Sequence, residues 1–285
     1  MAGSEPALTI RDVARRTGVP AGTLRMWEAR YGFPAPARLD SGHRRYSAAD
    51  CAAIARVLAE RARGLSLPAA IERVRASSDG GEPSLFAGLR RARPALAPQV
   101  LPKRSLIALS HAIEDELCAR GERALLFGAF QRVRFFRASE RRWRELARTA
   151  ELAVAFADFE RPRVRRHGVC ELPLAGDAPL RREWALVCEA ERLSVALTAW
   201  EITADKPVPD AERRFEAVWT VEPDAVREVA RAAAALAAAS APKLIRSRSG
   251  RLQEHPPPPP DLASVMALMS RCVAYLGAQP RPAAP

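Results

Sequence analysis

The chain has 285 residues, of which 48% are hydrophobic, and its 45 Lys and Arg against 33 Asp and Glu give a formal net charge of +12. This length predicts two domains, and the apolar content is ample for a sizeable core. No uncharged apolar run of about 18 residues is present and no export signal is evident at the N-terminus, so we expect a cytoplasmic protein without membrane contact.

The positive charge is concentrated at the two ends. Residues 1–75 hold thirteen arginines against seven acidic residues, residues 76–240 are nearly balanced, and residues 241–285 hold six basic residues against two acidic ones. A basic head on a neutral body is typical of a protein that binds a polyanion, although generic solubilisation by arginine explains the charge alone about as well. The five cysteines are dispersed without a CxxC pair, which predicts reduced, mostly buried thiols.

Four short helices are predicted in the first 75 residues. Thr9 can cap the first helix, and Ser47 with Asp50 resembles a capping box for the third. Gly18 ends the first helix and Gly32, followed by prolines, ends the second. The predicted helices span about residues 9–17, 20–31, 47–63 and 66–75.

The first two helices have the layout of a helix-turn-helix, since a tight Gly18-Val19-Pro20 turn joins them. Leu24, Trp27 and Tyr31 recur at helical spacing in the second helix and are expected inside. The opposite face then points outward, where small residues permit close approach and arginines reach phosphates or guanine edges. The outward-facing residues of this helix are Ala21, Gly22, Arg25, Met26 and Arg30.

A short arginine-rich hairpin is predicted after the second helix, with Ser41-Gly42 at its tip. Arginines at its base can lie along a phosphate backbone. Taken alone, the loop is better explained as a solvated hairpin, but its combination with the upstream helices favours DNA contact. His43 is interpreted as a backbone contact or turn residue. The hairpin candidates are Arg38, His43, Arg44, Arg45 and Tyr46.

These elements resemble the DNA-binding domain of the MerR family, and are similar to the branch that includes light-responsive, cobalamin-binding repressors. The resemblance rests on residues 8–19, on Thr23–Gly32 and on Ser41–Ser47. It implies a bacterial homodimer on an inverted repeat, with the second helix in the major groove, the hairpin on flanking backbone and RNA polymerase as a further partner at the promoter. The family positions associated with DNA contact are Thr23, Arg25, Arg44, Arg45 and Tyr46.

Two features depart from that family. The long helix that usually follows the fourth helix and forms an antiparallel dimer coil is not evident after Val74. Dimerisation is therefore expected to use the body, the C-terminal helix or both. The body also lacks the Glu-x-His-type cobalamin signature, so cobalamin is not carried over. The chain has no metal motif either, and the sequence leaves any cofactor unknown.

The remainder of the chain predicts a mixed α/β body followed by a tether and an isolated amphipathic helix. Helix and strand patterns alternate in the body, with a hairpin at Trp184–Glu189 and Leu193–Glu201. The C-terminal helix must dock on something, because isolated helices of this length are marginal. The fold class is therefore α+β multi-domain: an all-α winged helix-turn-helix head (1–76), a linker (77–102), the α/β body (103–240), a Pro-rich tether (241–260) and the helix (261–277).

The body resembles the DICT domain, a sensory module found with diguanylate cyclases and two-component proteins. The resemblance covers residues 101–158 and is carried by Ser105–Glu116, Leu126–Gln131 and Trp143–Leu146. It implies that the body receives a signal, and it names no ligand.

A flat organic ligand could stack among the aromatic side chains of the body, although core packing is the simpler explanation for strand aromatics. His111 and Asp115 share a helical face, which a solvated surface explains better than a proton or metal site. The pocket candidates are Phe127, Phe130, Trp143, Trp184 and Trp200.

No catalytic spacing is present: the chain has no GxSxG, Walker, GxGxxG or HExxH motif, so we do not expect an enzyme. The sequence predicts a one-component, sequence-specific transcriptional regulator that binds double-stranded DNA, with a slight preference for repression. The alternative is a ligand-binding signalling adaptor whose head contacts a protein. An acidic or apolar face on the second helix would favour the adaptor, and Ala21, Gly22 and Arg25 do not provide one.

Overall fold

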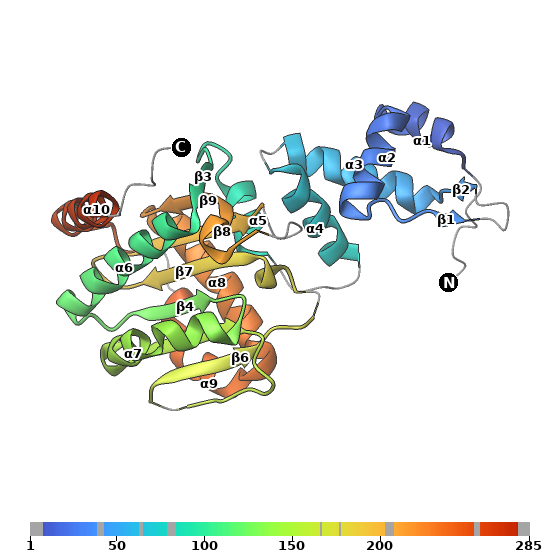
Figure 1. Cartoon of the computed structure of the whole chain (residues 1–285). Helices are drawn as coiled ribbons and strands as arrows, with labels where there is room; N and C mark the ends of the chain where they lie inside the picture. Colours follow the sequence, from blue (N-terminus) through green and yellow to red (C-terminus); the bar gives the residue numbers. More distant parts are fainter. Residues whose placement is uncertain are drawn as a thin grey trace. The chain divides into compact units, whose positions relative to one another are not determined.

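The structure is a computed structural model that describes residues 8–38, 43–62, 65–78, 84–165, 167–176, 178–202, 208–253 and 257–278. The chain divides into two compact units, Met1–Gly81 and Glu82–Pro285, which Figure 1 shows in colours that follow the sequence. Among the described residues, no helix combines the length and the hydropathy needed to cross a bilayer.

The first unit contains the four predicted helices and a two-stranded hairpin. Thr9 and Asp12 form a capping box, and Ser47 and Asp50 exchange the equivalent hydrogen bonds. Gly18 ends its helix at φ +73°, a left-handed conformation that favours glycine. The elements are α1 (Ile10–Thr17), α2 (Ala21–Tyr31), β1 (Ala37–Arg38), β2 (Arg44–Arg45), α3 (Ala48–Ala62) and α4 (Leu67–Ser78).

The core of the first unit lies between α1, α2 and α3. Val13, Leu24, Trp27, Ile54 and Val57 are at most 2% exposed. The prediction that Leu24 and Trp27 face inward is confirmed. The exposed side of α2 is therefore fixed by the burial of its opposite side.

The second unit is built on a seven-stranded mixed sheet with the order β3-β9-β8-β7-β4-β5-β6. Neighbours among β4, β5 and β6 run parallel, and all other pairs run antiparallel. The predicted hairpin is confirmed as the antiparallel pair β7–β8. The strands are β3 (Gln99–Pro102), β4 (Leu125–Ala129), β5 (Leu152–Ala157), β6 (Val169–Pro173), β7 (Glu183–Glu189), β8 (Val195–Glu201) and β9 (Arg214–Thr220).

Helices cover both faces of this sheet (Figure 1). One face is covered by α6 (Lys103–Arg120) and α7 (Val133–Thr149), with α10 (Leu262–Gly277) packed along α6. The other face is covered by α5 (Leu85–Ala92) and α8 (Pro223–Ser240), and α9 (Pro242–Arg248) packs on α8.

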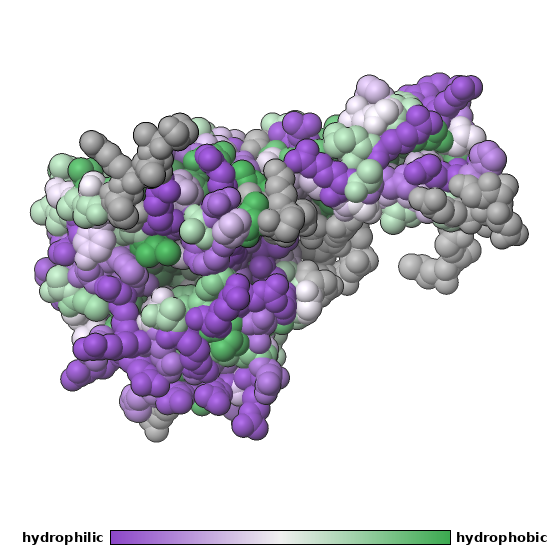
Figure 2. Space-filling model, viewed as in Figure 1, coloured by the Kyte–Doolittle hydropathy of each residue, from purple (hydrophilic) through white to green (hydrophobic). Residues whose placement is uncertain are grey.

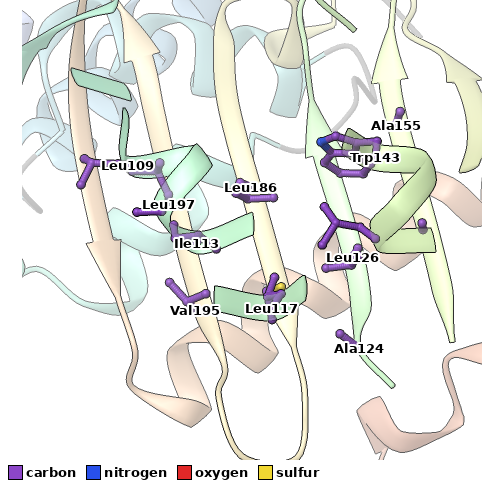
Figure 3. Close-up of a cluster of buried hydrophobic side chains, with 14 of the residues drawn as sticks. Leu109, Ile113, Leu117, Ala124, Leu126, Trp143, Ala155, Leu186, Val195 and Leu197 are labelled. Carbon is purple, nitrogen blue, oxygen red and sulfur yellow. The ribbon is translucent and has the colours of Figure 1, made fainter. Parts of the chain in front are cut away.

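The main apolar core lies under α6 and α7. Figure 3 shows Leu126, Leu186 and Leu197 on neighbouring strands, on the side that also holds Ile113 and Trp143. Residues at alternate positions of these strands point to the other face, toward α5 and α8.

Two segments predicted as connections are parts of the second unit. The linker prediction is wrong for residues 84–102, because Leu85, Phe86 and Leu89 of α5 are at most 2% exposed and β3 pairs with β9. The tether prediction is wrong for residues 242–253, which form α9 and a 3-10 turn that bury Ile245 and Leu252. The prolines in both segments favoured the prediction of a linker and a tether. The first turn of a helix nevertheless tolerates proline, as the start of α9 shows.

Candidate nucleic-acid interface and sensory cavity

One stripe of α2 faces solvent. Its polar members are two arginines, of which Arg30 lies over the ring of Tyr31 at 5.5 Å. Met26 is 43% exposed. Two other members of the stripe, Gly22 and Ala29, are small and let the helix approach a groove closely. The exposed stripe consists of Gly22, Arg25, Met26, Ala29 and Arg30.

The hairpin is fixed to α2 by an ion pair. Arg44 Nε donates to Glu28 Oε2 at 2.6 Å, and the two side chains are 36% and 15% exposed. The hydrogen bond to Glu28 holds the pKa of Arg44 above its usual range. Because Glu28 neutralises Arg44, this arginine holds the hairpin against α2 and adds little net positive charge.

Tyr46 corrects the prediction of a DNA contact. Its side chain is 0% exposed, and its backbone exchanges two hydrogen bonds with Leu8 at 2.9 Å. Alternation along the strand puts Tyr46 on the same side as Arg44 and turns Arg45 the other way. Burial raises the pKa of Tyr46. Tyr46 thus anchors the hairpin in the core, where it cannot reach a duplex.

The other predicted contacts are distributed around this surface. Ala21, Thr23 and Arg45 are half-buried, and His43 is exposed. Arg38 lies in β1 directly opposite Arg44, and its side chain lies outside the described residues. The same is true of the predicted tip, residues 41–42.

The second unit contains a cavity of about 230 Å³ between α6, α7 and the sheet. Figure 2 shows this face, where the helices carry mostly hydrophilic residues and hydrophobic side chains are visible in the hollows between them. Aromatic rings dominate the walls, and polar side chains, Ser139 of α7 among them, also reach the cavity. The lining includes Phe130, Phe135, Trp143, Trp184, Lys103, Ser110, His111 and Glu114.

The two tryptophans are held in place by α6. Trp143 Nε1 donates to Glu114 Oε1 at 3.0 Å, and Trp184 Nε1 donates to Ser110 Oγ at 3.0 Å. A Cβ on Gly128 would lie only 2.5 Å from the Trp143 ring, so glycine is required for this close approach. The polar atoms of both indoles are thus satisfied, and apolar ring surface remains for the cavity.

Glu114 is the buried carboxyl group of this cavity, with 4% exposure. Its Oε2 atom has no hydrogen-bond partner, although Arg142 Nε lies 3.2 Å away at ion-pair distance. Burial raises the pKa of Glu114 to about 7, against the opposing effects of Trp143 and Arg142. Burial also lowers the pKa of the neighbouring His111.

Two of the five pocket candidates are placed elsewhere. Phe127 and Trp200 are at most 1% exposed and occupy positions of β4 and β8 that alternate with the cavity side, under α5 and α8. Arg182 lies over the Trp200 ring at 5.1 Å. The register of the strands decides which aromatic residues face the cavity. The number of aromatic residues in the sequence does not reveal that register. Phe130, Trp143 and Trp184 do line the cavity.

Sequence reasoning missed Glu28, Ser110 and Glu114. The Glu28–Arg44 pair spans sixteen residues, so no helical spacing reveals it. Glu114 directly precedes Asp115, which the sequence predicts to lie on a solvated helical face. The apolar stripe of α6 gave the available signal, since Glu114 follows Ile113 and falls near the buried side of that helix. The described residues hold no cluster of His, Cys, Asp and Glu suited to a metal ion.

Comparison with known proteins separates the same two regions. Residues 8–77 match the family described as MerR HTH family regulatory protein. Residues 84–202 match DICT, described as a sensory domain in diguanylate cyclases and two-component systems. The HTH-type transcriptional repressor CarA of Myxococcus xanthus is 41% identical over 80 residues, a stretch that covers 27% of this chain and 27% of that protein. The chain therefore combines a MerR-family helix-turn-helix domain with a DICT sensory domain.

Proposed function

We propose that this protein is a one-component transcriptional regulator that binds double-stranded DNA through α2 and the adjoining hairpin. The observation that carries the proposal is the exposed stripe of α2, in which Arg25 and Arg30 lie with the small residues Gly22 and Ala29 beside a hairpin anchored by Glu28 and Tyr46. Arginines on such a helix read guanine edges and contact phosphates. The match of this unit to MerR regulators supports the same function.

The regulator acts as a homodimer on an inverted repeat, and α10 supplies the interface. Ser264, Leu268 and Cys272 are buried on the inner side of α10, which packs on α6. The outer side carries exposed apolar residues at the alternating four- and three-residue spacing of a coiled coil, and none is charged. This outer stripe is Leu262, Met266, Met269, Val273 and Leu276, of which Met269 is half-buried and the other four are exposed.

A second copy of the chain is the occupant of this stripe that the structure favours. Leu262 and Val273 are 73% and 71% exposed, unlike the polar outer face of an ordinary surface helix. In the first unit α4 ends at Ser78, without the long dimer helix usual in MerR relatives. Two α10 helices paired along these stripes bury both apolar faces at once.

Duplexes selected by the full-length protein from a random library test DNA binding. Arg25→Ala is expected to weaken binding of the selected duplex by about tenfold or more and to reduce its preference over random DNA, because a base contact is lost. Arg45→Ala is expected to weaken both duplexes equally. Arg148→Ala is the control, since it removes one charge from a side chain of α7 that is 75% exposed. Equal losses for Arg25→Ala and the control would contradict the assignment of α2.

Sedimentation equilibrium tests the dimer. Met266→Glu combined with Val273→Glu is expected to convert the dimer to a monomer with unchanged helix content, because two charges then face the paired stripe. Val164→Glu is the matched control, since Val164 is 49% exposed outside α10. A double variant that stays dimeric would exclude this interface.

We further propose that the protein represses transcription. The named relative is a repressor, and a dimer bound across a promoter can block polymerase. A reporter under a promoter that contains the selected duplex is expected to rise when the gene for the protein is deleted. A fall would identify an activator.

A further inference from the structure

We propose that the cavity between α6 and α7 binds the signal of the sensory domain, and that this signal is a small planar nitrogen compound that directs N–H groups at Glu114. The proposal concerns the second unit alone. Its failure would leave DNA binding by the first unit untouched.

The shape of the cavity selects the planar part of the ligand. Its volume of about 230 Å³ is below the ~300–1,000 Å³ of sites for drug-sized ligands, which favours one or two fused rings. Phe130 meets Trp143 edge-to-face at 5.1 Å and 76°, and Trp184 meets Phe215 at 6.1 Å and 79°. The rings are thereby fixed in orientation, so a flat ligand meets preformed walls.

Glu114 selects the polar part of the ligand. It is a carboxyl group that is almost fully buried, and only one of its two oxygens accepts a hydrogen bond. A buried polar atom left without a hydrogen bond is costly, so the second oxygen favours a ligand that donates one. Ser110 and the Trp143 indole are already engaged with the protein or with Glu114 itself. The other polar lining residues are Lys103, His111, Ser139 and Glu114, and of these Glu114 is the one with a buried oxygen that accepts no hydrogen bond, so it orients the ligand.

The charged groups around the cavity disfavour an anionic ligand. Lys103 is the cation closest to the aromatic walls, but its Nζ lies over the Phe135 ring at 4.2 Å and contacts Asp210. The ammonium group of Lys103 is therefore already engaged by the Phe135 ring and by Asp210. The cation at Glu114 is Arg142, whose Nε lies 3.2 Å from Glu114 Oε2 and is therefore already paired with that carboxyl group. An anionic ligand would face Glu114 with both nearby cations already engaged by carboxylates of the protein.

Two probes of similar ring size and opposite polar character test the proposal with the full-length protein. 2-Aminobenzimidazole presents N–H donors on a planar ring, whereas indole-2-carboxylate presents an anionic group. Isothermal titration calorimetry measures the affinity of both probes without the ultraviolet absorbance and emission that they share with tryptophan. We expect 2-aminobenzimidazole to bind saturably at one site per chain and indole-2-carboxylate to bind at least about tenfold more weakly.

Three variants separate the cavity from the rest of the sheet. Glu114→Gln keeps the acceptor for Trp143 and is expected to weaken 2-aminobenzimidazole by about tenfold. Gly128→Ala pushes the Trp143 ring toward the cavity and is expected to weaken it further. Trp200→Phe is the control on the opposite face of the same sheet and is expected to leave the affinity unchanged.

The outcomes are decisive in both directions. Equal affinity for the two probes, or an unchanged affinity in Glu114→Gln, would overturn the role of Glu114. A loss in Trp200→Phe as large as that in Gly128→Ala would overturn the location. Should Gly128→Ala fail to fold, a structure of the wild-type protein with 2-aminobenzimidazole bound outside the α6–α7 cavity would overturn the proposal instead.

Discussion

Glu28 is an acidic residue on the helix that we propose to enter a DNA groove, and its role is to position the hairpin. It holds Arg44 at 2.6 Å and thereby seats the hairpin on α2. An acid near DNA normally repels phosphate, so its presence on α2 indicates that the position of the hairpin matters more than one additional positive charge.

Removal of this acid gives a prediction with an unusual sign. Glu28→Ala is expected to weaken binding of a selected duplex by about three- to tenfold, because Arg44 loses its ion-pair partner and the hairpin is no longer held against α2. Fluorescence anisotropy checks the affinity. Glu145→Ala, which removes an acid 57% exposed on α7, should leave binding the same or slightly tighter. An increase in Glu28→Ala would mean that this residue acts through its charge alone.

The pH dependence of stability follows from Glu114. Its pKa is about 7 in the folded chain against an ordinary value of 4.5, so folding favours the protonated form. The free energy of unfolding of the wild-type protein is then expected to fall by about 3 kcal/mol relative to that of Glu114→Gln as pH rises from about 5 to about 8. His111, Asp115 and Arg142 face the same group and are unchanged in the comparison. Urea unfolding at both pH values measures this difference, and a gap that is constant with pH would contradict it.

Residue roles could be predicted where helical periodicity alone decides them. Burial of Leu24 and Trp27 and exposure of Arg25 follow from spacing along α2. Tyr46 and Glu114 could not be assigned this way, because their burial depends on contacts with other elements. A sequence pattern identifies charged and aromatic residue types, and the tertiary fold decides whether they face solvent.

At the scale of elements, α5 depends on a carboxylate from a distant strand. Glu183 Oε2 accepts hydrogen bonds from the backbone N–H groups of Leu85 and Phe86 at 3.0 and 3.1 Å, and Oε1 accepts one from Ser84. A negative charge at a helix N-terminus is favourable. Because this eight-residue helix is too short to be stable alone, Glu183 and the apolar face of α5 together hold it on the sheet.

Glu183→Ala is expected to lower the free energy of unfolding by about 2–4 kcal/mol, since three donors are left buried without their acceptor. Chemical denaturation measures the loss. Glu222→Ala removes an exposed ion pair with Arg93 and should cost less than about 1 kcal/mol. Similar losses in the two variants would show that the cap contributes no more than a surface pair.

Elements with strong hydrophobic periodicity or clear capping and helix-ending residues could be predicted from the sequence. Elements stabilised by contacts with residues distant in sequence could not. The helices of the first unit and the β7–β8 hairpin follow from local pattern. In contrast, α5 is a short helix within a proline-containing segment, and its N-cap Ser84 and first turn are held by Glu183, about a hundred positions away. The strand β3 is likewise stabilised by β9 at the far end of the unit.

At the scale of the whole molecule, the two proposed sites differ in their physics. Binding of DNA rests on exposed arginines, and the cavity rests on apolar walls with one buried carboxyl group. With Arg25, Arg30 and Arg45 contacting phosphate or base in each copy of a dimer, an increase from about 50 to about 200 mM salt is expected to weaken DNA binding by about 10³. Probe binding in the cavity should change by less than about twofold over the same range. Parallel titrations measure both, and an equal salt dependence would contradict the division.

The division into a basic head and a neutral body could be predicted from the distribution of charge along the sequence and from the resemblance to the MerR and DICT domains. The strand order was not, because β3 and β9 join one edge of the sheet from opposite ends of the unit. That order decides which aromatics share the α6–α7 side, and it therefore decides which of the predicted pocket residues line the cavity.

One helix contacts both the cavity and α10, the helix whose outer side carries the proposed dimer surface. α6 presents Ser110 and Glu114 to the cavity, and its Asp115 and Glu116 hold Tyr275 and Arg271 of α10. Thermodynamic linkage then makes any coupling reciprocal: a compound that strengthens pairing of two chains is itself bound more tightly by the pair, by the same factor. The concentration of signal at which the regulator responds therefore depends on how many copies of the protein the cell contains.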